Sequence, residues 1–305
     1  MELIKFVSTD NIELNGILYK SENAKNKKII LAVHGMTSNC FKKRDEIIAK
    51  KANDEGIDYF CFNNRGSEIT KYIARKGSGR KELGGTAYED VLDGYYDICG
   101  AILKLVEIGY KNIYLQGHSL GCTKIVYTYN KLKDENSNIL EYIKGVILLS
   151  LVNIPATLRV FLGDNYNKYL GLAEEKEKEG KELELMPKES FIHPVSAKTF
   201  LRYIRDNQDF DFVDESKDPE LSKINNIDVP LFMRWGNINE LILEDAKTYS
   251  EKIDNIVKNH QKDISYIDGA DHGYHNKETE LAKQIIEFVC KYWVMEANEW
   301  FNYLK

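Results

Sequence analysis

Short apolar runs alternate along the chain with segments whose apolar residues recur at helical spacing. The strand-like runs occupy residues 6–8, 12–19, 28–34, 58–63, 112–116, 143–151, 229–235 and 264–267. The helix-like segments occupy residues 45–55, 88–107, 117–130 and 278–293. This alternation predicts an α/β fold with a mostly parallel central sheet flanked by helices. The first two runs are close enough in sequence to form an opening hairpin.

One stretch interrupts the alternation. Residues 155–214 contain no convincing buried strand, and residues 174–179 form a charged segment with helical character. A long strandless stretch between two predicted strands of one sheet indicates an inserted unit. We therefore expect a main domain of residues 1–154 and 215–305, with a helical insertion at residues 155–214 that covers one edge of the sheet.

Charge and cysteine content narrow the class of protein. The chain has 305 residues, with 42 Lys and Arg against 48 Asp and Glu, for a formal net charge of −6. This balance argues against nucleic acid or an anionic membrane surface as the main partner, because both require a basic face. No apolar run approaches the length of a membrane span, and the first residues lack the features of a signal peptide. The 5 cysteines are scattered, without the spacing of metal ligands, so we expect free thiols in the cytoplasm and no metal or cofactor.

The motif that carries chemistry is Gly117-His118-Ser119-Leu120-Gly121, which matches G-x-S-x-G. It lies between a predicted strand and a predicted helix, the context in which this pattern indicates a nucleophile elbow. Side chains at positions 117 and 121 would collide with the neighbouring strand and helix, which explains the glycines. The sharp turn projects the Ser119 hydroxyl above the sheet. The Leu120 N–H group, at the start of the helix, points into the same space and can hold an oxyanion.

A serine hydroxyl is a weak nucleophile and needs a general base. Of the 6 histidines, His272 and His275 follow the last predicted strand. A loop after that strand can reach the carboxyl edge of the sheet, where Ser119 is expected. His272 is the predicted base because it is followed by glycine and comes after the nucleophile in chain order, with His275 as the alternative. His34, at the end of an early strand, is interpreted as structural.

Taken together, these motifs resemble those of serine esterases with the α/β-hydrolase fold. The loop that begins at His34 is similar to that of bacterial feruloyl or cinnamoyl esterases, and residues 186–200 are similar to a segment of fungal siderophore esterases. The resemblance implies a helical lid at residues 155–214 and the Met36 N–H group as the second oxyanion donor. It covers residues 1–150 and 220–295, and its matching elements are His34-Gly35-Met36, Asn64-Arg65-Gly66, Gly117 to Gly121, and Asp271-His272-Gly273.

The acidic member of the triad is where the chain departs from the family. The family places an aspartate after the strand at residues 229–235, at the position that Asn239 occupies here, and Glu240 follows it. Such an acid keeps the histidine in the correct tautomer and stabilises the imidazolium. Three alternatives remain: Glu240 acts through a loop shift, Asn239 holds His272 weakly, or an acid from another strand end takes the role. Asp271 is interpreted as a turn former.

The sequence therefore predicts a serine hydrolase that cleaves a small-molecule carboxylic ester. Ser119 is expected to form the acyl-enzyme, His272 to act as general base and acid, and Met36 and Leu120 to hold the oxyanion. Because Asn239 replaces the usual acid, one alternative is a non-catalytic binding protein on the same fold. Another is a thioesterase or amidase that uses the same triad, since one fold supports many activities.

Overall fold

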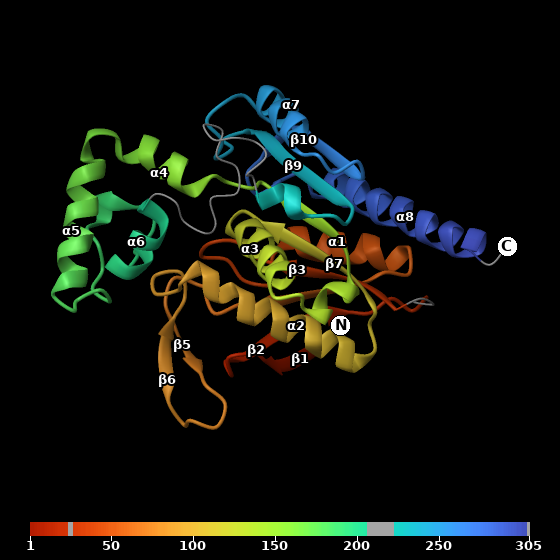
Figure 1. Cartoon of the computed structure of the whole chain (residues 1–305), viewed down its shortest axis with the longest axis horizontal. Helices are drawn as coiled ribbons and strands as arrows, with labels where there is room; N and C mark the ends of the chain where they lie inside the picture. The colour runs from red at the N-terminus through yellow and green to blue at the C-terminus, as the bar shows by residue number, and fades with distance from the viewer. Residues whose placement is uncertain (24–26, 206–222, 304–305) are drawn as a thin grey trace.

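The structure is a computed structural model that describes residues 1–23, 27–205 and 223–303, with side chains through residue 292. Figure 1 shows a twisted central sheet with helices on both faces. The sheet contains β1 (Glu2–Val7), β2 (Glu13–Tyr19), β3 (Lys28–Val33), β4 (Asp58–Asn63), β7 (Asn112–His118), β8 (Ile143–Leu149), β9 (Leu231–Ile238) and β10 (Lys262–Asp271). The helices are α1 (Lys43–Asp54), α2 (Gly94–Ile108), α3 (Leu120–Asp134), α4 (Ile154–Leu162), α5 (Tyr166–Lys178), α6 (Ala197–Ile204), α7 (Ala246–Ile256) and α8 (Glu278–Tyr303).

The strands lie in the order β1-β2-β4-β3-β7-β8-β9-β10. β2 runs antiparallel to β1 and β4, and every pair from β4 onward is parallel. The predicted mostly parallel sheet and its opening hairpin are therefore confirmed. Because parallel strands point the same way, the carboxyl ends of β3, β7, β8, β9 and β10 meet at one edge, where loops from distant parts of the chain come together.

Both faces of the sheet are buried, which explains the continuous apolar runs. All six residues of β3 are buried, as expected for a central strand covered on both sides. One face packs against α2, α3 and α7, and the other packs against α1 and α8. No helix within the described ranges is long and apolar enough to cross a membrane.

Between β8 and β9 the described residues form three α-helices that lie together at one end of the molecule (Figure 1). These helices, α4, α5 and α6, agree with the helical character predicted for residues 155–214, although the predicted end of that segment lies outside the described residues. Ser196 caps α6 by accepting the Thr199 N–H, and its own N–H donates to Ala87 O at 2.7 Å. Arg202 Nη2 donates to Asp90 Oδ2 at 2.6 Å. These contacts attach α6 to the segment that precedes α2.

Two features of the fold differ from the sequence prediction. The helix expected at residues 88–107 begins with a separate 3-10 turn at Val91–Asp93, and α2 proper starts at Gly94. Outside the central sheet, β5 (Lys71–Ala74) and β6 (Lys81–Gly84) form an antiparallel hairpin that the apolar pattern did not indicate. Both strands are short and largely exposed, so they lack the alternation of apolar and polar residues that marks a half-buried strand.

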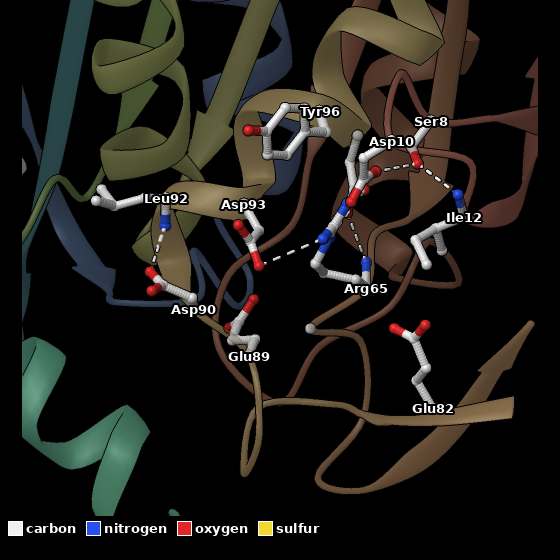
Figure 2. Close-up of polar contacts among 12 residues, drawn as sticks. Ser8, Asp10, Ile12, Arg65, Glu82, Glu89, Asp90, Leu92, Asp93 and Tyr96 are labelled. Carbon is white, nitrogen blue, oxygen red and sulfur yellow. Dashed lines mark hydrogen bonds and ion pairs between the residues drawn. The ribbon is translucent and has the colours of Figure 1, made fainter. Parts of the chain in front are cut away.

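A cluster of ionised groups joins β4 to α2. The Arg65 guanidinium donates to Asp97 Oδ1 at 2.8 Å and to Asp10 Oδ1 at 2.7 Å, and it lies 3.4 Å from Asp93 Oδ2. Figure 2 shows the Arg65 side chain between Asp10 and Asp93. The Asp97 side chain is 0% exposed. Arg65 therefore has a structural role, as a cation that compensates a carboxylate excluded from water.

Arg65→Met is expected to lower the free energy of unfolding by about 3–5 kcal/mol, because removing one partner of a buried ion pair leaves the other charge uncompensated. Urea denaturation would measure this change. Lys20→Met is the control, since Lys20 pairs with Glu2 at the exposed surface. Such a pair contributes at most about 1 kcal/mol. Equal losses in the two variants would contradict the assigned role of Arg65.

Candidate active site

The G-x-S-x-G turn connects β7 directly to α3. Ser119 lies between them with φ 53° and ψ −123°, a conformation that is strained for a residue with a side chain. A Cβ atom at Gly117 would lie 2.6 Å from Cys122 N, and one at Gly121 would lie 2.2 Å from Val33 O. The collisions expected from the sequence are thus present. The Ser119 N–H donates to Leu149 O at 2.9 Å, which ties the turn to the end of β8.

Two backbone N–H groups lie beside this serine. Leu120 is the first residue of α3, so its N–H group has no acceptor within the helix. Met36 belongs to the loop after β3, and its N–H makes no hydrogen bond to any described residue. A Cβ at Gly35 would lie 3.0 Å from Ser119 Cβ, so the loop backbone runs directly against the elbow. Met36, Ser119 and Leu120 line the same cavity.

His34 stabilises the loop after β3 through hydrogen bonds of its ring. Its Nε2 atom accepts the Asn64 N–H at 3.3 Å, which leaves Nδ1 to donate to Gly35 O at 2.9 Å. Burial, together with the nearby Lys124 charge, lowers the pKa of His34 to about 3. The ring is therefore neutral and acts as a fixed donor and acceptor, in keeping with the structural interpretation from the sequence.

Glu240 holds His272. Its Oε1 atom is hydrogen-bonded to His272 Nδ1 and also accepts the Leu241 N–H at 2.9 Å. Its Oε2 atom accepts the Ser150 hydroxyl at 2.7 Å and the Gly236 N–H at 2.9 Å. The Glu240 side chain is 3% exposed and the His272 side chain 23%. Burial alone would raise the pKa of Glu240, but the hydrogen bonds from His272, Ser150 and Gly236 outweigh it and lower the pKa below the usual 4.5. Glu240 is therefore a carboxylate at neutral pH.

The backbone explains why position 240 rather than 239 faces the histidine. Asn239 is exposed and has a φ of 50°, a left-handed conformation that asparagine tolerates. The register of β10 against β9 shifts between Ile267 and Asp271, and such bulges re-aim the residues that follow them. A Cβ at Gly236 would lie 2.3 Å from Ala270 O, so the two strands approach closely here.

The other candidates from this region have different partners. Among the described residues, Asn239 makes no hydrogen bond to His272. The end of β8 contributes the Ser150 hydroxyl rather than a carboxylate. Asp271 accepts the N–H groups of Gly273 and His275 and binds His275 Nδ1 at 2.8 Å, which agrees with its interpretation as a turn former.

Three residues near His272 were not singled out as members of the site by the sequence. His118 Nε2 donates to the His272 carbonyl at 2.7 Å, and burial keeps the pKa of His118 well below 6.5, so the ring stays neutral. The Ser150 hydroxyl lies 3.0 Å from the Tyr274 hydroxyl, which donates to Arg234 O at 2.7 Å. His118 could have been found from its place inside the motif. Ser150 and Tyr274 carry no such signal.

A cavity of about 640 Å³ opens above Ser119 and His272. One part of its wall comes from α1 and the residue before it, with Lys42, Lys43 and Arg44. Within the described ranges, no hydrogen bond joins Ser119 Oγ to the His272 ring. Catalytic pairs commonly tighten only when substrate is bound. The apolar part of the wall contains Ile154, Leu158, Phe161, Phe191, Ile192 and Leu241.

The strand order, the strained serine between β7 and α3, and the Glu240–His272 pair at the carboxyl edge define a protein with the α/β-hydrolase fold. A family model described as protein of unknown function (DUF1749) matches residues 101–294, and the chain belongs to that family. A comparison with curated proteins gives no match.

Solved structures share this fold over nearly the whole chain. Est1E from Butyrivibrio proteoclasticus, bound to ferulic acid, has a TM-score of 0.65 at 15% identity, covering 95% of this chain and 99% of Est1E. DcsB in complex with its substrate analogue has a TM-score of 0.66 at 12% identity, covering 95% and 98%. A soluble monoglyceride lipase variant from Saccharomyces cerevisiae, with a substrate analogue, has a TM-score of 0.61 at 16% identity, covering 94% of each chain. At these identities the likeness establishes the fold.

Proposed function

We propose that this protein is a carboxylic ester hydrolase that works through an acyl-enzyme on Ser119. The observation that carries the proposal is the buried Glu240–His272 pair at the cavity that Ser119 also lines. A carboxylate that orients a histidine beside a strained serine is the arrangement used for nucleophilic acyl transfer. The similar structures of Est1E and monoglyceride lipase carry the same fold with ferulic acid or a substrate analogue bound, which supports ester chemistry.

The proposed mechanism has two similar halves. Ser119 Oγ attacks the ester carbonyl carbon while His272 Nε2 takes the hydroxyl proton, and Glu240 stabilises the imidazolium. The N–H groups of Met36 and Leu120 bind the oxyanion of the tetrahedral intermediate, which collapses as His272 gives its proton to the leaving alcohol. Water then attacks the acyl-enzyme with the same base and oxyanion donors, and the carboxylic acid leaves with Ser119 restored.

We further propose that residues 1–154 and 215–305 form the catalytic domain and that residues 155–214 form its lid. Leu158 and Phe161 of α4, with Phe191 and Ile192, form an apolar part of the cavity wall, which supports this division. Phe191 also stacks on Tyr203 of α6 at 5.6 Å between ring centroids, so part of this wall is held within the same unit. Phe200 is fully buried and belongs to the packing of the unit rather than to the cavity.

Labelling with a fluorophosphonate probe tests the proposal. We expect the native protein to acquire one covalent adduct, located on Ser119 by peptide mass spectrometry, because only an activated serine displaces the fluoride. Ser119→Ala should remain unlabelled. Absence of labelling in the native protein would refute the esterase proposal and favour a non-catalytic binding protein. A panel of p-nitrophenyl, cinnamoyl, thioester and amide substrates would then separate ester hydrolysis from thioesterase or amidase activity.

We also propose a cytoplasmic location. The cysteines, all within the described part of the chain, are free thiols, and Cys40, Cys61, Cys99 and Cys122 are buried. Unpaired cysteines are typical of reducing compartments.

A further inference from the structure

The start of α1 carries basic residues at a position where a helix disfavours them, although the acidic residues Asp45 and Glu46 follow in the same turn. The helix follows Lys42 and opens with Lys43 and Arg44, and no side chain of the described residues caps this end by a hydrogen bond. The N-terminus of a helix already carries a partial positive charge, so cations there are unfavourable and anions favourable. All three side chains line the cavity above Ser119. Three basic residues at a helix N-terminus that also line a cavity indicate a functional role.

Arg44 gives the second, independent observation. Its side chain is 7% exposed, and its buried Nε atom has no hydrogen-bond partner among the described residues. The nearest carboxylate oxygen, Asp45 Oδ1, lies 3.6 Å from Nε and accepts the Tyr59 hydroxyl at 3.0 Å. A buried N–H group without a hydrogen-bond acceptor is costly, and an oxyanion bound by the same guanidinium would offset part of that cost.

The remaining lining does not neutralise these cations. Glu278 is the one carboxylate among the described residues that line the cavity, and its Oε1 atom lies 3.7 Å from Lys43 Nζ. Arg44 has its acidic neighbour Asp45 outside the wall, and Lys42 has no carboxylate partner among the described residues. The chain as a whole has a net charge of −6, so this positive patch runs against its overall charge.

We propose that the ester cleaved at Ser119 carries a carboxylate or phosphate group, and that this group binds at the start of α1. Lys42, Arg44 and the first-turn N–H groups of the helix would hold the anion, as helix N-termini with basic side chains do. The apolar wall formed by Leu158 and Phe161 would take the hydrocarbon part of the substrate. The proposal rests on the proposed ester hydrolysis and adds the substrate class.

Matched pairs of p-nitrophenyl esters test this substrate class. The half-esters of adipate, pimelate and suberate each carry a terminal carboxylate, and the hexanoate, heptanoate and octanoate esters are their neutral counterparts. The readout is the ratio of kcat/KM for the anionic ester to that for the neutral ester of equal length. For the best-fitting pair we expect a ratio of about 10 at low salt, falling by at least about threefold in about 0.5 M NaCl because salt screens the attraction.

The double variant Lys42→Gln/Lys43→Gln removes two exposed cations from the cavity rim. It is expected to lower the ratio by about threefold or more, because each cation contributes a modest screened attraction and Arg44 is still present. The matched control is Lys50→Gln/Lys51→Gln, which makes the same charge change on the same helix at residues that do not line the cavity. We expect the control to keep the wild-type ratio within about twofold, since its charges lie farther from the bound anion. Arg44→Gln should lower the ratio as well.

The outcomes distinguish the proposed anion site from the proposed ester hydrolysis on which it rests. Hydrolysis of both ester sets with a neutral preference in the wild type, or equal ratios in the two double variants, would overturn the anion site and leave the esterase intact. A lack of hydrolysis of every ester, together with no fluorophosphonate labelling, would instead refute the proposed function. Phosphate as a competitive inhibitor, weakened in Lys42→Gln/Lys43→Gln and not in the control, would support the same site without any ester.

Discussion

Ser119→Ala is expected to lower kcat for p-nitrophenyl esters by a factor of about 10⁴–10⁶, the range seen when a triad nucleophile is removed. The reason is that the Ser119 hydroxyl is the atom that forms the acyl-enzyme, and no other group in the site can replace it. Alanine and serine both carry a Cβ atom, so the strained φ of 53° costs a similar free energy in each. We therefore expect the same elbow backbone in the two proteins.

Initial rates with the purified variant would measure this loss, and thermal unfolding would show whether the variant folds. Ser38→Ala is the control, because Ser38 lines the same cavity and has no role in the proposed mechanism. A Ser119→Ala protein that retains more than about 1% of the wild-type kcat would mean that the measured hydrolysis does not use the acyl-enzyme.

Glu240→Gln is expected to lower kcat by about 10⁴, the cost observed when an amide replaces a triad carboxylate. The amide cannot stabilise the imidazolium by charge, and it can hold the imidazole in the wrong tautomer. Asn239→Gly is the matched control at the neighbouring position, since Asn239 is exposed and glycine accepts its left-handed φ of 50°. Steady-state kinetics of the two variants would compare them, and a larger loss in Asn239→Gly would reject Glu240 as the acid.

The lowered pKa of Glu240 makes the free energy of unfolding depend on pH, and the direction of that dependence follows from proton linkage. A carboxyl group with a pKa below its unfolded value of 4.5 stabilises the native state above that value, and the stabilisation disappears as pH falls through the folded pKa. Glu240→Gln lacks this group. The difference in unfolding free energy between wild type and variant should therefore shrink as the pH falls from about 6 to about 3. A difference that stays constant over this range would contradict an ionised Glu240 in the native state.

Much of the fold could be predicted because its signals are local. The apolar run that became β3 and the glycines on either side of the Ser119 turn reflect contacts set by the immediate backbone geometry. The position of His272 also followed from chain order and from where a strand must end. The hairpin of β5 and β6 could not be predicted, because its short exposed strands bury too little apolar surface to leave a pattern.

The surroundings of His272 depended on distances between segments far apart in the chain. The sequence left Glu240 and Asn239 as alternatives, since both follow β9 and both can bind an imidazole. The bulge in β10, the close approach at Gly236 and the left-handed turn at Asn239 together bring Glu240 to His272. Ser150, at the end of a third strand, then joins the same carboxylate.

The sequence by itself determined the class of fold, through the alternation of apolar patterns, and the elbow that presents Ser119, through steric limits within a few residues. Chain order and the end of the last strand then predicted that His272 lies near this elbow. Only the tertiary structure decided that Glu240 rather than Asn239 meets His272, and that Lys42 and Arg44 face the cavity above Ser119. The contact between Glu240 and His272 depends on strand register and on a bulge. The placement of Lys42 and Arg44 depends on how α1 packs against the sheet. Both arise from the burial of side chains from many segments at once, so no single stretch of sequence encodes them.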